Sequence, residues 1–118
     1  MKEPKDWPPT LRTGFLRQWQ ERPETEALNL RGESWSYAEL GRRAAAVAHA
    51  LERVRQDADP PLVGILASRS ISAFAGILGT LFAGYGYLPL NPKFPAGRLR
   101  RLLEMSGCRT VVIGPEAV

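Results

Sequence analysis

Few residues in this chain of 118 have the types and spacing that chemistry needs. Cys108 is the only cysteine and His49 the only histidine, which excludes an internal disulfide and argues against a metal site built from soft ligands. We interpret Cys108, which precedes an apolar run, as a buried inert thiol. We interpret His49, which lies in a helical pattern, as structural or solvent-facing. No serine has a histidine or lysine at a spacing typical of nucleophilic catalysis.

Two glycine patterns match phosphate-binding loops only in part. The run Gly84-Tyr-Gly86-Tyr-Leu-Pro89 begins like GxGxxG, but it ends in proline and follows a helical pattern rather than a strand. Gly79 and Gly84 have the spacing of a P-loop, but Tyr85 stands where that motif needs lysine. We therefore interpret these glycines as turn and packing residues, and we predict no catalytic, cofactor-binding or metal-binding residue in this chain.

The net charge of +4 and the pI near 9.7 raise nucleic acid or an anionic membrane surface as partners. The densest basic cluster, Lys93 with Arg98, Arg100 and Arg101, is not interleaved with stacking aromatic residues, so we interpret it as a solvated helix face. Residues 70–92 carry no charge, but glycine and proline interrupt them, which favours a helix, a turn and a strand over a membrane span. We expect neither a nucleic acid nor a membrane partner.

The first half of the chain predicts a helix, a small hairpin and a second helix. Residues 1–10 are polar and proline-rich, and we expect a flexible N-terminus without a secretory signal, hence a cytoplasmic protein. Apolar residues over 11–21 have helical spacing, and the runs 26–30 and 33–36 flank a glycine turn. Ser36 and Glu39 have capping-box spacing, and Leu40, Ala44, Val47, Leu51 and Val54 then form one apolar stripe. Glu39 can also pair with Arg43.

The second half predicts an α/β fold with a βαβαβ parallel half-sheet over about 62–113. Leu62–Ala67 is typical of a strand buried on both faces. Ser70 can cap a helix that ends at Gly84, and 86–90 predicts another buried strand with Pro89 near its end. A third helix over 96–105 should direct Leu99, Leu102 and Leu103 inward, and 110–113 predicts the last strand. Such βαβ units imply right-handed connections between the strands.

Two longer motifs, over residues 35–40 and 81–98, resemble those of adenylate-forming enzymes, most closely the adenylation domains of nonribosomal peptide synthetases. The run Trp35-Ser36-Tyr37-Ala38-Glu39-Leu40 resembles the first core motif, Leu-(Thr/Ser)-Tyr-x-Glu-Leu. The run from Leu81 to Arg98 resembles the second core motif, and the matching positions are Ala83, Gly84, Tyr87, Pro89, Asn91, Pro92, Pro95 and Arg98. Phe82 and Asn91 depart from the lysine and aspartate that are common there, which leaves the subgroup open.

The resemblance implies that residues 11–118 are a partial N-terminal subdomain of an adenylation domain and that the motif residues are structural. It implies a parent enzyme that activates an amino or carboxylic acid with ATP and Mg²⁺ and then loads the acyl group onto a carrier-protein thiol. The phosphate loop, the ribose-binding aspartate and the catalytic lysine of the family are absent from these residues. We therefore expect no catalysis and no bound cofactor from this chain alone.

A half-sheet leaves strand edges and an apolar face uncovered. We expect the remainder of the adenylation domain or a second copy of the chain to cover them. The alternative is a standalone, non-catalytic interaction module that oligomerises or pairs with a partner chain. A weaker third hypothesis is a basic module for membrane surfaces or nucleic acid.

Overall fold

The computed structural model describes residues 11–115, so the predicted flexible segment 1–10 lies outside the described residues. The elements follow the predicted order, and their bounds are α1 Leu11–Glu21, β1 Glu26–Leu30, β2 Glu33–Ser36, α2 Tyr37–Val54, β3 Leu62–Leu66, α3 Ile71–Phe82, β4 Gly86–Leu90, α4 Ala96–Ser106 and β5 Thr110–Ile113. The predicted hairpin and the βαβαβ order are both confirmed.

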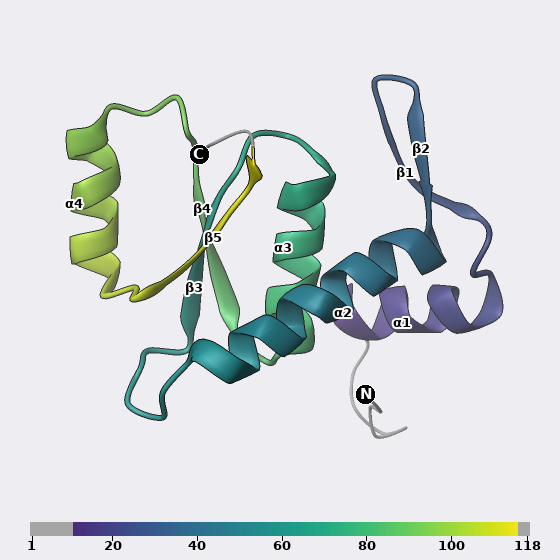
Figure 1. Ribbon diagram of the computed structural model, residues 1–118, viewed down its shortest axis with the longest axis horizontal. Coiled ribbons are helices and arrows are strands. Elements are labelled where there is room, and N and C mark those ends of the chain that lie inside the picture. Colours follow the sequence, from purple (N-terminus) through teal and green to yellow (C-terminus); the bar gives the residue numbers. More distant parts are fainter. Residues whose placement is uncertain (1–10, 116–118) are drawn as a thin grey trace.

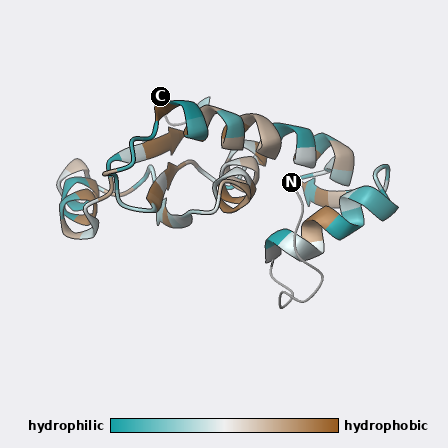
Figure 2. Ribbon diagram, turned by 90° about the horizontal axis from the view of Figure 1, so that it is seen from below, coloured by the Kyte–Doolittle hydropathy of each residue, from teal (hydrophilic) through white to brown (hydrophobic). Residues whose placement is uncertain are grey.

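The three-stranded sheet has the order β4-β3-β5, and both pairings are parallel. The chain therefore steps from β3 to one edge and then crosses to the other edge. Figure 1 and Figure 2 show α3 on one face of the sheet and α4 on the opposite face. Two right-handed connections that run in opposite directions along a sheet place their helices in this way.

The central strand β3 is buried on both faces, as predicted. Val63 and Ile65 lie in an apolar cluster with Leu51 of α2 and Ile77 of α3, while Gly64 on the other face lies close to Leu90. Figure 2 shows the most hydrophobic residues gathered in the sheet and α3. The core of the α/β part therefore forms around one strand.

The prediction that 86–90 is a buried strand is wrong. In β4, Leu90 is buried, but Tyr87 is 40% exposed and Gly86 and Pro89 are exposed as well. The reason is topological: among residues 11–115, β4 is an edge strand with a neighbour on one side only. Pro89 suits that position, since an edge strand tolerates a residue without a backbone donor.

Helices α2 and α3 pack through small side chains. Ala44 and Ala48 of α2 share a buried cluster with Ala75 and Leu78 of α3. Of the predicted stripe, Leu40, Ala44 and Leu51 are buried and Val47 is half-buried, but Val54 is 65% exposed. Val54 is the last residue of α2, beyond the reach of the cluster.

Helix α1 and the β1–β2 hairpin pack around the start of α2. The ring of Phe15 lies 5.4 Å from that of Tyr37 and 6.0 Å from that of Phe82, centroid to centroid. The Tyr37 N–H donates to the carbonyl of Thr25 at 3.0 Å. Phe15 thus links α1, α2 and the end of α3.

Helix α4 is the least covered helix. None of its residues is buried; Leu99, Leu102 and Leu103 are half-buried, so the predicted inward stripe is only partly correct. Met105 is 79% exposed. Among the described residues, no helix is both long and apolar enough to cross a bilayer.

Candidate functional site

The first motif forms the N-terminal cap of α2. The Glu39 N–H donates to Ser36 Oγ, and the Ser36 N–H donates to Glu39 Oε1, both at 3.1 Å. This is the predicted capping box, and it satisfies backbone donors that a helix start leaves unpaired. Tyr37 contacts Phe15, and Leu40 lies in the core. Each residue of this motif therefore contacts neighbouring elements or the cap of α2.

The hydrogen bonds to the Glu39 carboxylate lower its pKa below the ordinary value, with the Ser36 backbone N–H as the main cause. Arg42 and Arg43 lower the same pKa by weaker charge interactions. The guanidinium of Arg43 lies 4.9 Å from the centre of the Trp35 ring. The predicted Glu39–Arg43 ion pair is therefore wrong for the described residues, because the guanidinium of Arg43 lies over Trp35 of the hairpin and acts on Glu39 only as a weaker charge.

The first part of the second motif ends α3 and turns the chain into β4. Ala83 is the C-cap residue, and Gly84 follows with a φ of 86°, a conformation that favours glycine. The Gly84 N–H donates to the carbonyl of Leu81 at 3.0 Å. Gly79 lies inside α3 at its crossing with α2. These glycines thus cap and pack a helix, as predicted, and they do not form a loop that could hold phosphate.

The second part of this motif shapes the loop between β4 and α4. Asn91 Oδ1 accepts from the Lys93 N–H at 2.9 Å, and the Asn91 carbonyl accepts from the Phe94 N–H at 3.0 Å. Pro92 lies inside this turn, and Pro95 is the N-cap residue of α4. The departure from aspartate at Asn91 retains the side-chain acceptor, so the turn forms with either residue.

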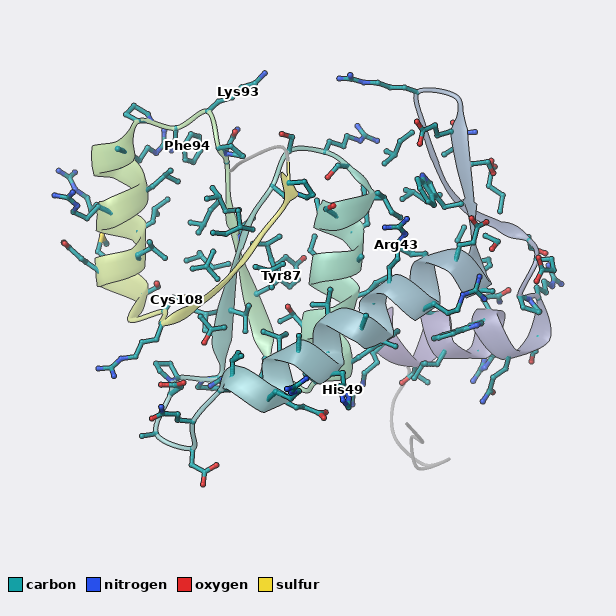
Figure 3. All side chains as sticks on the ribbon, viewed as in Figure 1. Arg43, His49, Tyr87, Lys93, Phe94 and Cys108 are labelled. Atoms are coloured by element: carbon teal, nitrogen blue, oxygen red, sulfur yellow. The ribbon has the colours of Figure 1, made fainter. Side chains whose placement is uncertain are left out.

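The four residues of the predicted basic cluster, Lys93 with Arg98, Arg100 and Arg101, do not form one continuous surface. Arg98 lies over the ring of Phe94, 3.9 Å from its centre, while Arg100 and Arg101 are exposed on α4. The expectation that aromatic residues are absent from this cluster is wrong, since Phe94 stacks within it. Lys93 instead projects from the β4–α4 loop at the end of the molecule that also holds the hairpin turn (Figure 3).

The isolated reactive side chains, Cys108 and His49, lie in different parts of the described chain. The Cys108 thiol is half-buried, so it is less buried than predicted, and it lies 3.1 Å from the carbonyl oxygen of Thr110. His49 is exposed on α2, as the solvent-facing interpretation expected. Residues 11–115 contain no group of three or more histidine, cysteine or acidic side chains that could hold a metal ion.

Two hollows of the surface lie at the carboxyl edge of the sheet. A hollow of about 810 Å³ lies between the hairpin and the β3–α3 loop, and a second of about 520 Å³ adjoins it. Both are lined by Arg31, Ser68, Arg69 and Lys93. We call the two hollows together the carboxyl-edge groove. Ligands of open α/β sheets bind at this edge, so the groove is the candidate functional site.

Comparison with known proteins identifies the family. The model of the AMP-binding enzyme family matches residues 15–118, so the chain belongs to that family. Indigoidine synthase of Dickeya dadantii is 34% identical over 90% of this chain and 7% of its own length. Tyrocidine synthase 3 of Brevibacillus parabrevis is 36% identical over 88% of this chain and 2% of its own length. The chain thus spans less than a tenth of either relative.

A solved structure supports the same assignment. The nonribosomal peptide synthetase FmoA3, in a form with bound α-methyl-L-serine-AMP, superposes with a TM-score of 0.81 at 33% identity. The superposition covers 90% of this chain and 12% of that chain. The α/β fold, the family resemblance and the correspondence to the N-terminal part of an adenylation domain are therefore confirmed.

The two motifs could be found in the sequence because they are local, whereas the carboxyl-edge groove could not. Arg31, Arg69 and Lys93 are far apart in the chain and come from three different connections. The sequence does contain one signal for the groove. Arg69 and Lys93 each follow a strand of the same parallel sheet, and the carboxyl ends of parallel strands meet at one edge of the sheet. Arg31 had no such signal, since nothing in the sequence fixes the direction of the hairpin.

Proposed function

We propose that this chain is the structural N-terminal part of an enzyme that activates an amino or carboxylic acid. The parent enzyme would join the acid to ATP, release pyrophosphate and transfer the acyl group to a carrier-protein thiol. ATP and Mg²⁺ would be its cofactors, and the cytoplasm its location. The observation that carries the proposal is the family match over 15–118 together with the superposition on a synthetase that holds an aminoacyl adenylate.

Within that enzyme we assign residues 11–118 a supporting role, as part of the N-terminal subdomain. The motif residues support this assignment because they make caps, turns and core contacts: Ser36 and Glu39 cap α2, Gly84 ends α3, and Asn91 shapes the loop before α4. The remainder of the adenylation domain would cover the free edges of β4 and β5. The chain alone would neither bind ATP nor catalyse the reaction.

A chimera tests the supporting role. Residues 15–115 would replace the equivalent segment of the FmoA3 adenylation domain, and amino-acid-dependent ATP–pyrophosphate exchange would be measured. We expect exchange with the amino-acid preference of the recipient, because this segment supplies fold and no reacting group. A chimera that folds and lacks exchange, or one with a new amino-acid preference, would contradict the proposal.

The isolated 118-residue chain is the second arm of that experiment. It should show no exchange above the buffer background with any of the common amino acids. Exchange by the pure chain would show that it contains an active site, and the supporting role would then be abandoned. A chimera carrying Gly79→Leu, which disrupts the contact of α2 with α3, serves as the misfolded control.

A further inference from the structure

The carboxyl-edge groove has a charge pattern that the adenylation role does not explain. Three cations line its larger hollow: Arg31 from the hairpin turn, Arg69 from the β3–α3 loop and Lys93 from the β4–α4 loop. All three side chains are exposed. Within residues 11–115, none of these cations has an ion pair or hydrogen-bonding partner for its side chain. Glu33 is the one carboxylate among the residues that line this hollow.

The backbone holds Arg31 at the groove in an unfavourable conformation. Arg31 has a φ of 52°, and Gly32 follows with a φ of 89°. Turns of this kind favour asparagine or glycine at the first position, because a positive φ strains most side chains with a Cβ, whereas asparagine tolerates it and glycine has no Cβ. The Gly32 N–H donates to Asn29 Oδ1 at 3.2 Å, which fixes the turn locally. Arginine at this position places a positive charge at the groove, although asparagine would give a more stable turn.

The surroundings of the three cations argue against phosphate and nucleic acid as ligands. Phosphate sites use free backbone N–H groups at a helix start, and in α3 one of these groups is already occupied, since the N–H of Ala73 donates to Ser70 Oγ. Single-stranded nucleic acid needs open aromatic faces for stacking. Arg43 and Arg98 already lie over Trp35 and Phe94, the aromatic residues that line the two hollows.

An extended acidic peptide fits the groove better. Leu30 and Ile71 line the same hollow as the three cations, so a strand with alternating apolar and acidic side chains can contact both kinds of residue. Unpaired cations are costly to bury permanently within one domain, whereas exposed charges are typical of the rim of reversible interfaces. We propose that the carboxyl-edge groove binds an extended acidic segment of a separate polypeptide, with Arg31, Arg69 and Lys93 as its charge partners.

The test measures binding of a fluorescein-labelled peptide that alternates glutamate and valine to the 118-residue chain, by fluorescence anisotropy at low salt. A peptide with glutamine in place of glutamate is the uncharged control. The groove variant is Arg31→Asn/Arg69→Gln/Lys93→Gln. The matched variant, Arg17→Gln/Arg100→Gln/Arg101→Gln, removes the same charge from exposed positions outside the groove.

We expect saturable binding of the acidic peptide that the groove variant weakens roughly tenfold, while the matched variant changes it less than about twofold. Circular dichroism spectra of both variants must equal that of the parent chain. Equal loss in both variants would mean attraction by net charge alone and would overturn the proposal. Equally tight binding of tripolyphosphate, of a single-stranded oligonucleotide or of the glutamine peptide would overturn it as well. None of these readouts depends on adenylation activity.

Discussion

Gly79 of α3 lies against the backbone of Ala44 in α2, so close that a Cβ on Gly79 would come within 2.6 Å of the Ala44 carbonyl oxygen. The same Cβ would also lie 2.6 Å from that of Val47. Backbone cannot move aside as a flexible side chain can. The absence of a side chain at this one position therefore sets the distance between the two helices.

Gly79→Ala should destabilise the chain, although alanine is normally the better helix residue. We expect the free energy of unfolding to fall by about 1–3 kcal/mol, since the added methyl group forces α2 and α3 apart. Urea unfolding followed by tryptophan fluorescence measures this change. The control is Gly97→Ala in α4, where no atom lies near the added Cβ and a gain of up to about 1 kcal/mol is expected. Equal effects of the two substitutions would contradict the close contact.

The capping box predicts the effect of removing the Ser36 hydroxyl. Ser36→Ala leaves the Glu39 N–H without its acceptor at the buried start of α2. The free energy of unfolding should fall by about 0.5–2 kcal/mol. Ser36→Asp retains an acceptor and should lose less, so a larger loss in Ser36→Asp than in Ser36→Ala would count against the cap.

The lowered pKa of Glu39 predicts a dependence of stability on pH. Because the folded-state pKa lies below the ordinary value of 4.5, ionised Glu39 stabilises the fold above pH 4.5. That stabilisation is lost as the pH falls through the folded-state pKa. Glu39→Gln keeps the hydrogen bond to the Ser36 N–H but cannot titrate.

The urea midpoint of the parent chain should therefore fall more steeply between neutral pH and acidic pH than that of Glu39→Gln. Glu104→Gln, an exposed substitution in α4, is the charge-matched control and should keep the parental slope. The pKa of Glu26 is also lowered by its hydrogen bonds to Ser34 and Asn29. Glu26 should therefore account for part of the pH dependence of the urea midpoint that remains in Glu39→Gln. Parallel pH curves for the parent and Glu39→Gln would exclude the contribution of Glu39.

Arg55 joins two connections near the amino edge of the sheet, the one between α2 and β3 and the one between α3 and β4. Its Nη2 group donates to the carbonyls of Asp59 and Pro60, and its guanidinium lies 3.9 Å from the centre of the Tyr85 ring. Arg55→Met keeps the apolar stem but loses these contacts, so the free energy of unfolding should fall by about 1–3 kcal/mol. Arg53→Met, at an exposed position of α2, should change it by less than about 0.5 kcal/mol. Thermal unfolding followed by circular dichroism compares the two variants. Equal shifts of their melting temperatures would contradict the stabilising role of Arg55.

The free edge of β5 predicts self-association of the isolated chain. Ile113 is 52% exposed at this edge, which has no strand neighbour among residues 11–115. Sedimentation velocity should show concentration-dependent association, and Ile113→Lys should reduce it. Val54→Lys, at an exposed apolar position of α2, should leave it unchanged. A parent chain that sediments as a monomer at every concentration would refute this expectation.

Local signals made most of the fold predictable. Ser36, Ser70 and Gly84 mark helix ends by backbone chemistry that acts within a few residues, and the structure has these caps. Burial was less predictable, because it depends on strand order. The one local signal that β4 is an edge is Pro89, whereas the place of β4 in the sheet follows only once β5 pairs with the other side of β3.

The candidate site was less predictable than the fold for the same reason. Lys93 was grouped with Arg98, its neighbour in the sequence, whereas the structure groups it with Arg31 and Arg69. Helical spacing pairs Arg43 with Glu39, whereas in the structure the guanidinium of Arg43 lies over Trp35 of the hairpin. In both cases a residue from another element or connection supplies the contact.

The central position of β3 has a consequence for synthesis. As the chain leaves the ribosome, β3, α3 and β4 emerge first and can pair at once, while the other edge of β3 stays open until β5 emerges. During that interval the most apolar strand of the sheet presents unpaired backbone groups to the cell. Slow translation between Asn91 and Arg109 would lengthen that exposure, and fast translation of α4 would shorten it.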